Sequence, residues 1–144
     1  MGNKFVSTID SFVITLPDGW SEYDDGEEAY CFFNPTNEAW SGNLRITYLE
    51  FPDADNLNSD KAGQYMTDEL KDNPEAIEIV LGNHKCIYYK NTSEDDCLIY
   101  YWVTGESKHL FLCSFTIDKR QEHTQLNKQQ LESVKNIITS IEVI

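Results

Sequence analysis

Few residues of this chain have the types and spacing that a chemical reaction needs. The segment Gly105-Glu106-Ser107-Lys108-His109 begins like a nucleophile elbow. It lacks the second glycine and lies between two strand patterns, so we interpret it as a turn. His84 and Cys86 are two residues apart and share one face of a predicted strand, where they could begin a metal or Cys-His site. Two such groups do not complete a site, and a structural histidine beside a buried thiol is the favoured interpretation.

Metal and nucleotide motifs are incomplete in this sequence. Asp53-Ala54-Asp55 begins like an EF-hand calcium loop, but Leu57 occupies a ligand position and Asn58 replaces the required glycine. Gln64 stands where a bidentate glutamate belongs, and neither G-x-G-x-x-G nor the P-loop pattern occurs. The four cysteines are spaced too widely for a zinc knuckle and form no C-x-x-C pair. We therefore predict no catalytic residues, no metal and no cofactor, and we expect a protein that is not an enzyme.

The remaining candidates suit binding. Arg45 lies between Leu44 and Ile46 on a predicted strand, and its side chain alternates with theirs. It points to solvent, pairs with an acid, or binds an anionic group if it lies in a concave site with Trp20 or Trp40. The residues predicted to bind a ligand or partner are Trp20, Tyr23, Asp24, Asp25, Trp40 and Arg45.

The charge of the chain restricts its partners. The formal net charge is -14, from 25 acidic and 11 basic residues, and such a field repels nucleic acid and anionic membranes. Acidic residues concentrate in 22–28 and in 94–96, which either attract a basic protein or a cation, or are solvated loops that keep the protein soluble. We expect a protein partner, no nucleic acid and no membrane, with the chain itself a monomer or a weak dimer.

Targeting signals are missing from the given sequence. Residues 1–7 contain no apolar run of signal-peptide length, and no stretch of about 18 apolar residues occurs. Val6 stands where N-myristoylation of Gly2 needs serine or threonine. We expect a cytoplasmic protein whose Cys31, Cys86, Cys97 and Cys113 are reduced, buried thiols.

The elements that position these residues begin with a strand. Phe12–Leu16 alternates, and the Pro17-Asp18-Gly19 turn that follows it delivers Trp20 outside the sheet. Residues 29–33 and 44–51 also have strand patterns, and we expect these three strands to form a meander. The 144 residues contain no linker or repeat, which indicates a single domain.

Two helices are predicted. The first runs from Ser59, which caps it, to Asp72, and its apolar stripe faces the core. The second runs from about Asn127 to Ser140 and covers one sheet face with an uninterrupted apolar stripe. That stripe is formed by Leu131, Val134, Ile137, Ile138 and Ile141.

Four further strands are predicted in the second half, over 77–81, 84–90, 97–103 and 109–117. If Gly105 and Glu106 form the central turn of the last hairpin, Trp102 faces His109 and Tyr100 faces Phe111. Both faces of this hairpin are apolar, so it should be central and covered on each side. The pattern predicts an α+β fold, with an antiparallel sheet of about six to seven strands flanked by two helices.

The chain resembles a known family at several motifs. Leu-Pro-x-Gly-Trp at 16–20, an acidic turn, an aromatic hairpin and a closing helix resemble the PsbP/Mog1-like fold. The segments 20–23, 32–34, 42–47, 114–118 and 137–141 look like the DUF3805 family of bacterial proteins. Relatives of this fold mostly act as binding or assembly factors, so the resemblance implies a non-enzymatic protein without naming its partner.

Two functions follow as expectations. The first is a non-catalytic interaction module that uses an acidic, aromatic surface to bind another protein, in one form as an immunity-type protein against a basic toxin. The second is a small-ligand-binding protein or weak hydrolase with a site between sheet and helix that uses Arg45, His84 or Trp40. A pocket of about 300 Å³ or more with converging polar groups would favour the second.

Overall fold

Two antiparallel sheets and two helices make up the described chain. The computed structural model describes residues 2–8, 11–24, 26, 28–37, 39–51 and 60–144. The larger sheet has seven strands in the order β3 (Ser21–Tyr23), β4 (Tyr30–Phe33), β5 (Asn43–Glu50), β9 (His109–Asp118), β8 (Cys97–Glu106), β7 (His84–Thr92) and β6 (Ile77–Leu81). The smaller sheet has three, β1 (Asn3–Val6), β2 (Phe12–Leu16) and β10 (Glu142–Val143). The helices are α1 (Lys61–Asp72) and α2 (Gln125–Thr139), with a short 3₁₀ turn, η1 (Lys119–Gln121). This arrangement confirms the predicted α+β class.

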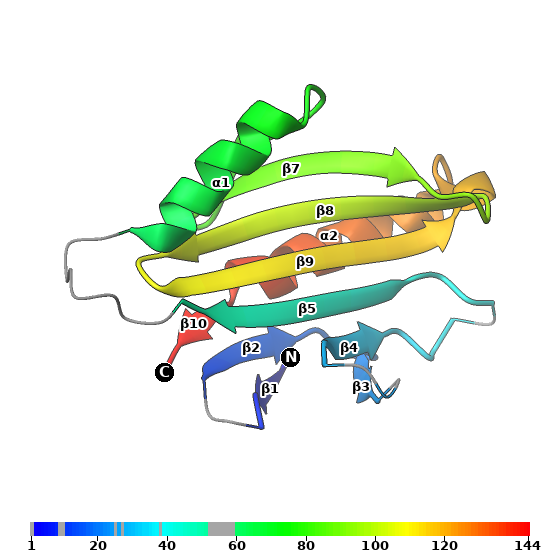
Figure 1. The fold of residues 1–144 in the computed structure, drawn as a ribbon. Helices are drawn as coiled ribbons and strands as arrows, with labels where there is room; N and C mark the ends of the chain where they lie inside the picture. Colours follow the sequence, from blue (N-terminus) through cyan, green and yellow to red (C-terminus); the bar gives the residue numbers. More distant parts are fainter. Residues whose placement is uncertain (1, 9–10, 25, 27, 38, 52–59) are drawn as a thin grey trace.

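The main core lies on one face of the seven-stranded sheet. The helix α2 and the small sheet both pack against this face. Figure 1 shows α2 behind β8 and β9 and the small sheet below β5. From the small sheet, Phe12 and Ile14 are fully buried, and α2 contributes Val134, Ile137 and Ile138, also at 0% exposure. The apolar stripe predicted for the last helix therefore covers one face of the sheet, as expected, and excludes water from it.

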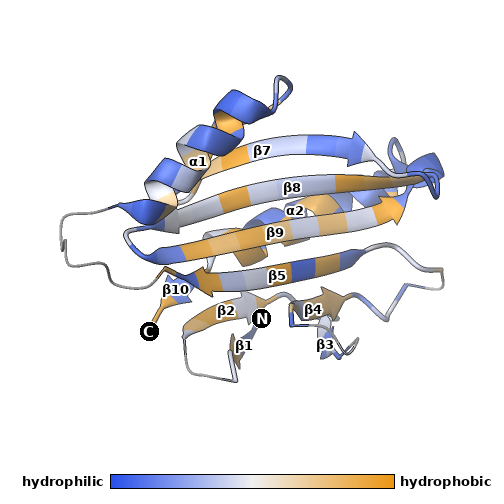
Figure 2. Cartoon of the chain, in the orientation of Figure 1, coloured by the Kyte–Doolittle hydropathy of each residue, from blue (hydrophilic) through white to orange (hydrophobic). Residues whose placement is uncertain are grey.

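The opposite face is covered at one end only. The helix α1 packs Ala62 and Met66 against Ile87, Val103 and Leu110 in a second, smaller cluster. Figure 1 shows α1 crossing the sheet over β7 and β8, with the remainder of β5, β8 and β9 in front of α2 and not under a helix. Figure 2 shows hydrophilic residues over much of α1 and mixed hydropathy along the uncovered strands. This uncovered area is called the open face below.

The β8–β9 hairpin is central, as predicted, but its register differs. Glu106 pairs with His109, so Ser107 and Lys108 form the turn, and Trp102 faces Cys113 instead of His109. Ser107 adopts a φ of 58°, and its N–H donates to Asp60 Oδ1 at 2.9 Å. A contact from the start of α1 thus fixes the turn two residues later than local turn preferences indicate. The shift is even, so each side chain keeps its predicted face.

The predicted meander of three strands is wrong for its first strand, residues 12–16. β4 and β5 pair with each other, but β2 pairs with β1 on one side and with β10 on the other. Both edges of β2 are therefore occupied by chain ends, and it cannot join the larger sheet. The sequence pattern of residues 12–16 predicts a strand but carries no information on which distant strands complete its hydrogen bonds.

Asp60 connects α1 to the hairpin. It is the N-cap of α1, and Ser59, the predicted cap, lies outside the described residues. Its Oδ1 accepts the N–H of Gly63 at 3.0 Å as well as that of Ser107 at 2.9 Å. We expect Asp60→Ala to lower the free energy of unfolding by about 1–2 kcal/mol, because both N–H groups lose their acceptor. Urea denaturation checks this. Asp60→Asn, which keeps an acceptor oxygen, should stay within a few tenths of a kcal/mol, and an equal loss in both variants would contradict the capping role.

Candidate binding sites on the open face

Trp20 does not contribute to a surface site. Its side chain is 5% exposed and packs against Phe115, with 6.4 Å between ring centroids, inside the main core. The prediction of Trp20 as a binding residue is wrong because the turn after β2 directs the indole inward, where a large apolar ring gains most from burial.

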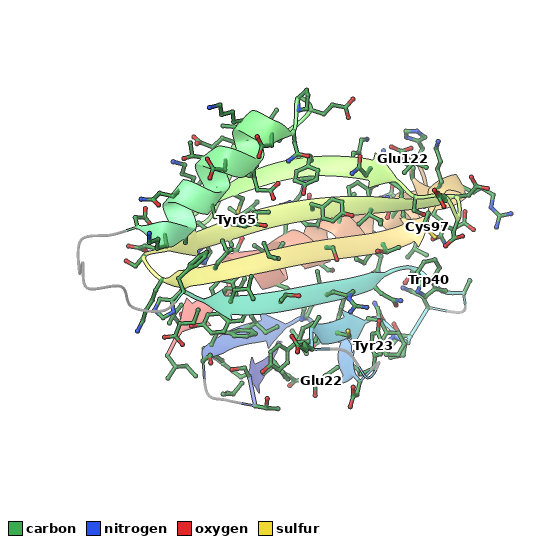
Figure 3. The ribbon with its side chains drawn as sticks, in the orientation of Figure 1. Glu22, Tyr23, Trp40, Tyr65, Cys97 and Glu122 are labelled. Carbon is green, nitrogen blue, oxygen red and sulfur yellow. The ribbon has the colours of Figure 1, made fainter. Side chains whose placement is uncertain are left out.

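Tyr23 and Asp24 lie at the β3 edge of the sheet. The Tyr23 ring packs edge-to-face on Phe33 at 5.2 Å between centroids. Asp24 is exposed, and its Oδ1 accepts the N–H of Gly26 at 2.8 Å, so its carboxylate stabilises the loop. Asp25 lies outside the described residues. Tyr23 is half-buried, and Figure 3 shows it at this edge of the sheet.

Arg45 stands in a cross-strand row on the open face. It pairs with Ser114, Ser114 with Tyr101, and Tyr101 with Tyr89, so β5, β9, β8 and β7 each contribute one side chain. Side chains directly opposite each other on antiparallel strands share a face and lie side by side. Sequence reasoning singled out Arg45 alone, because the wrong hairpin register hid the alignment of the other three.

A small hollow lies between this row and α1. Its volume is about 190 Å³. From α1, Tyr65 and Glu69 face the sheet, and Figure 3 shows Tyr65 projecting from the helix toward it. The full lining is Arg45, Thr47, Tyr65, Glu69, Tyr89, Tyr101, Val103, Leu112, Cys113 and Ser114.

Glu69 organises the α1 side of the hollow. Its Oε2 accepts the Asn73 amide at 2.7 Å and the Tyr89 hydroxyl at 3.4 Å. Burial, together with the negative charge of Glu69, raises the pKa of Tyr89 to about 12, and the same two causes raise the pKa of Tyr65. Both tyrosines therefore stay neutral hydroxyl groups at physiological pH. Tyr89 and Tyr101 stack with 4.8 Å between centroids, which fixes the wall they form.

A larger cleft lies at the far end of the open face, around Trp40. Its volume is about 510 Å³, and its lining is Trp40, Asp95, Asp96, Cys97, Asp118, Lys119 and Arg120. Trp40 is 44% exposed, although its position is fixed. Its Nε1–H donates to Asn43 Oδ1 at 2.9 Å, and its carbonyl accepts the Gln121 amide at 2.9 Å. Figure 3 shows Trp40 and Cys97 at this same end of the sheet.

The carboxylates of this cleft differ in their partners. Asp118 accepts two N–H groups of the Arg120 side chain, at 2.7 and 3.1 Å, and these hydrogen bonds lower the pKa of Asp118 to about 2. Asp96 has a φ of 57°, and its carbonyl accepts the Lys119 N–H at 3.1 Å, which holds the loop against the end of β9. Asp95 and Asp96 are exposed. Among the described residues, neither side chain makes a hydrogen bond, and the charge of Asp96 interacts with that of Arg120.

His84 and Cys86 have structural positions. His84 Nε2 lies 2.9 Å from the carbonyl oxygen of Ile141, which ties β7 to the end of α2. The Cys86 thiol donates to the His84 carbonyl at 3.6 Å, and burial raises its pKa. Cys31, Cys86 and Cys113 are buried, as predicted, whereas Cys97 is half-buried at the Trp40 cleft. Among the described residues, no group of three or more histidine, cysteine, aspartate or glutamate side chains is placed to hold a metal ion.

The seven-stranded antiparallel sheet has α2 and the small sheet on one face and α1 over part of the other face. This arrangement defines a PsbP-like α+β protein. The solution structure of cyanobacterial PsbP (CyanoP) from Synechocystis sp. PCC 6803 is similar, with a TM-score of 0.56 and 13% identity over 99% of this chain and 92% of that one. At this identity the likeness concerns the fold alone.

The chain belongs to the family described as "Domain of unknown function (DUF3805)", whose model matches residues 1–144. A crystal structure from Bacteroides thetaiotaomicron VPI-5482 is similar with a TM-score of 0.76 and 27% identity. The match covers 99% of this chain and 48% of that one, so this chain spans about half the length of that relative. No curated protein matches the sequence.

Neither helix in the described ranges has the length and apolar character that crossing a bilayer would require.

Proposed function

We propose that this protein is a non-catalytic binding module of the cytoplasm, and that the Trp40 cleft receives a cationic side chain of a basic protein partner. The observation that carries the proposal is an exposed tryptophan, fixed by hydrogen bonds, in a cleft that the exposed side chains of Asp95 and Asp96 also line. Among the described residues, Trp40 is the largest side chain with more than a third of its surface exposed.

Trp40 suits the role of an aromatic anchor. Tryptophan is enriched among the residues that dominate binding energy, and its flat face attracts lysine and arginine cations. The hydrogen bonds to Asn43 and from Gln121 hold the ring before any partner arrives. Little conformational entropy is therefore lost on binding, which favours a recognition role over a mobile surface side chain.

The surrounding charge selects for a cation. Asp95 and Asp96 line the cleft with Trp40, and the chain as a whole has a formal net charge of -14. A negative field speeds the encounter with a basic partner, and local carboxylates then orient its lysine or arginine. Lys119 and Arg120 also line the cleft, where Arg120 is engaged with Asp118.

A tri-arginine peptide tests the cleft directly. Trp20 and Trp102 are 5% and 0% exposed, so a change in tryptophan emission on adding the peptide reports on Trp40. We expect a saturable change that weakens as salt is raised from about 50 to 300 mM, because exposed charge pairs are screened. Asp96→Asn should reduce the affinity about two- to fivefold, which corresponds to the worth of one exposed charge contact.

Glu94→Gln provides the matched control. Glu94 belongs to the same acidic loop and carries the same charge, but it does not line the cleft. The control should keep the affinity within a factor of about two, since only the long-range field changes. Trp40→Ala, followed by amide NMR shifts, should reduce affinity about two- to fivefold through the lost cation–π contact. Equal losses in Asp96→Asn and Glu94→Gln would mean that the net charge alone binds the peptide, and the cleft would have no specific role.

A further inference from the structure

We propose that the hollow between α1 and β5 is a second binding site, for a small aromatic carboxylate with a hydroxyl group at its far end. The inference is independent of the Trp40 cleft. It depends on the side chains of the cross-strand row and of α1, which enclose a volume of about 190 Å³.

The β5 end of the hollow presents donors suited to an anion. The guanidinium of Arg45 can bind a carboxylate through two parallel N–H groups, and the adjacent Ser114 hydroxyl can add a third hydrogen bond. Arg45 also interacts within the chain, and its guanidinium carries five N–H groups. The hydroxyls of Thr47, Ser114 and Tyr101 make no hydrogen bond to any other described residue, so this end has free polar capacity.

The middle of the hollow suits a ring. Val103 and Leu112 face each other across β8 and β9 and supply apolar surface in the row next to Arg45. Tyr89 and Tyr101 stack on each other at an interplanar angle of 22° and add aromatic surface to the lining. An apolar cavity of about 150 Å³ takes up benzene, so about 190 Å³ accommodates one six-membered ring with a small substituent.

The α1 end has the opposite polarity. Glu69 holds the hydroxyl of Tyr89 at 3.4 Å and is itself held by Asn73 at 2.7 Å, so an acceptor is fixed at this end. A second carboxylate there would be repelled, whereas a hydroxyl group can donate to Glu69 or accept from a tyrosine. The hollow therefore sets a direction, with the carboxylate of the ligand toward Arg45 and its hydroxyl toward α1.

The probe that matches these requirements is 4-hydroxybenzoate, titrated into the full chain and followed by backbone amide NMR shifts. We expect saturable shifts for Thr47, Tyr101 and Ser114 and none in the Trp40 cleft. For a ligand of this size a dissociation constant in the millimolar range is expected. The neutral 4-hydroxybenzamide should bind at least about fivefold more weakly, because it loses the charge-assisted hydrogen bonds.

Two variants test whether Arg45 binds the carboxylate of the ligand. Arg45→Gln should weaken 4-hydroxybenzoate at least about fivefold and leave 4-hydroxybenzamide unchanged, while Arg120→Gln, which removes the same charge from the other cleft, should leave both unchanged. A thermal melt establishes that each variant is folded. If Arg45→Gln does not fold, the affinities of the unaltered chain for 4-hydroxybenzoate and 4-hydroxybenzamide still test whether the site selects a carboxylate. Equal binding of acid and amide, or no saturable shift in Thr47, Tyr101 and Ser114 up to 20 mM, roughly 20 times the expected lower limit, overturns the proposal.

Discussion

Phe12→Ala is expected to lower the free energy of unfolding by about 3–5 kcal/mol. Phe12 is 0% exposed and belongs to the small sheet, yet its ring packs edge-to-face on Tyr30 at 5.4 Å and on Phe111 at 5.2 Å between centroids. These contacts join the small sheet to two strands of the larger one. Truncation to alanine loses the transfer energy of the ring and leaves a cavity between the sheets, and both terms destabilise the fold.

The neighbouring Val13 is the control for this prediction. It lies on the same strand with its side chain on the other face and is half-buried. Val13→Ala should cost about 1 kcal/mol or less, and urea unfolding of both variants gives the comparison through the midpoint and the slope. If the two substitutions cost the same, the small sheet does not depend on its contact with the main core. A changed slope for Phe12→Ala alone would indicate that the small sheet unfolds separately.

Much of this architecture follows from local sequence patterns. The apolar stripe of residues 131–141 predicted a core-facing helix, and α2 occupies that place because a one-sided helix has only one stable way to bury its surface. The alternation in β8 and β9 predicted a central hairpin, and its face assignments hold despite the shifted turn. The partners of β2 could not be predicted, since β1 and β10 are short and come from opposite ends of the chain.

The candidate sites were predicted less completely, for a related reason. Arg45 was identified as a charged residue between apolar neighbours, and Trp40 as a residue that could share a concave site with it. They line two separate hollows instead. Ser114, Tyr101 and Glu69 were missed because each is unremarkable in its own segment and becomes relevant only through pairing across strands or packing of α1. Trp20 illustrates the opposite error. A tryptophan after a turn was predicted to bind a ligand or partner, whereas its side chain is buried in the apolar core.

Gly42→Ala is expected to be the second strongly destabilising change, with a loss of about 2–6 kcal/mol. Gly42 has a φ of +124°, and a Cβ at this position would lie 2.3 Å from Cζ of Phe115, a fully buried ring. The positive φ strains any other residue by about 1–3 kcal/mol, and forcing the ring aside in a filled core costs a further 1–3 kcal/mol or so. Equilibrium urea unfolding measures the sum.

Gly26→Ala separates these two causes. Gly26 also has a positive φ, of +82°, but a Cβ there has no neighbour within 4 Å, so only the backbone strain remains. Its loss should be about 1–3 kcal/mol and smaller than that of Gly42→Ala. Gly42 lies between Trp40 and Asn43, which hydrogen bond to each other, so a displaced backbone should also alter the emission of Trp40. Equal losses in both variants, with unchanged Trp40 emission, would mean that the Phe115 ring yields freely and that Gly42 does not position the cleft.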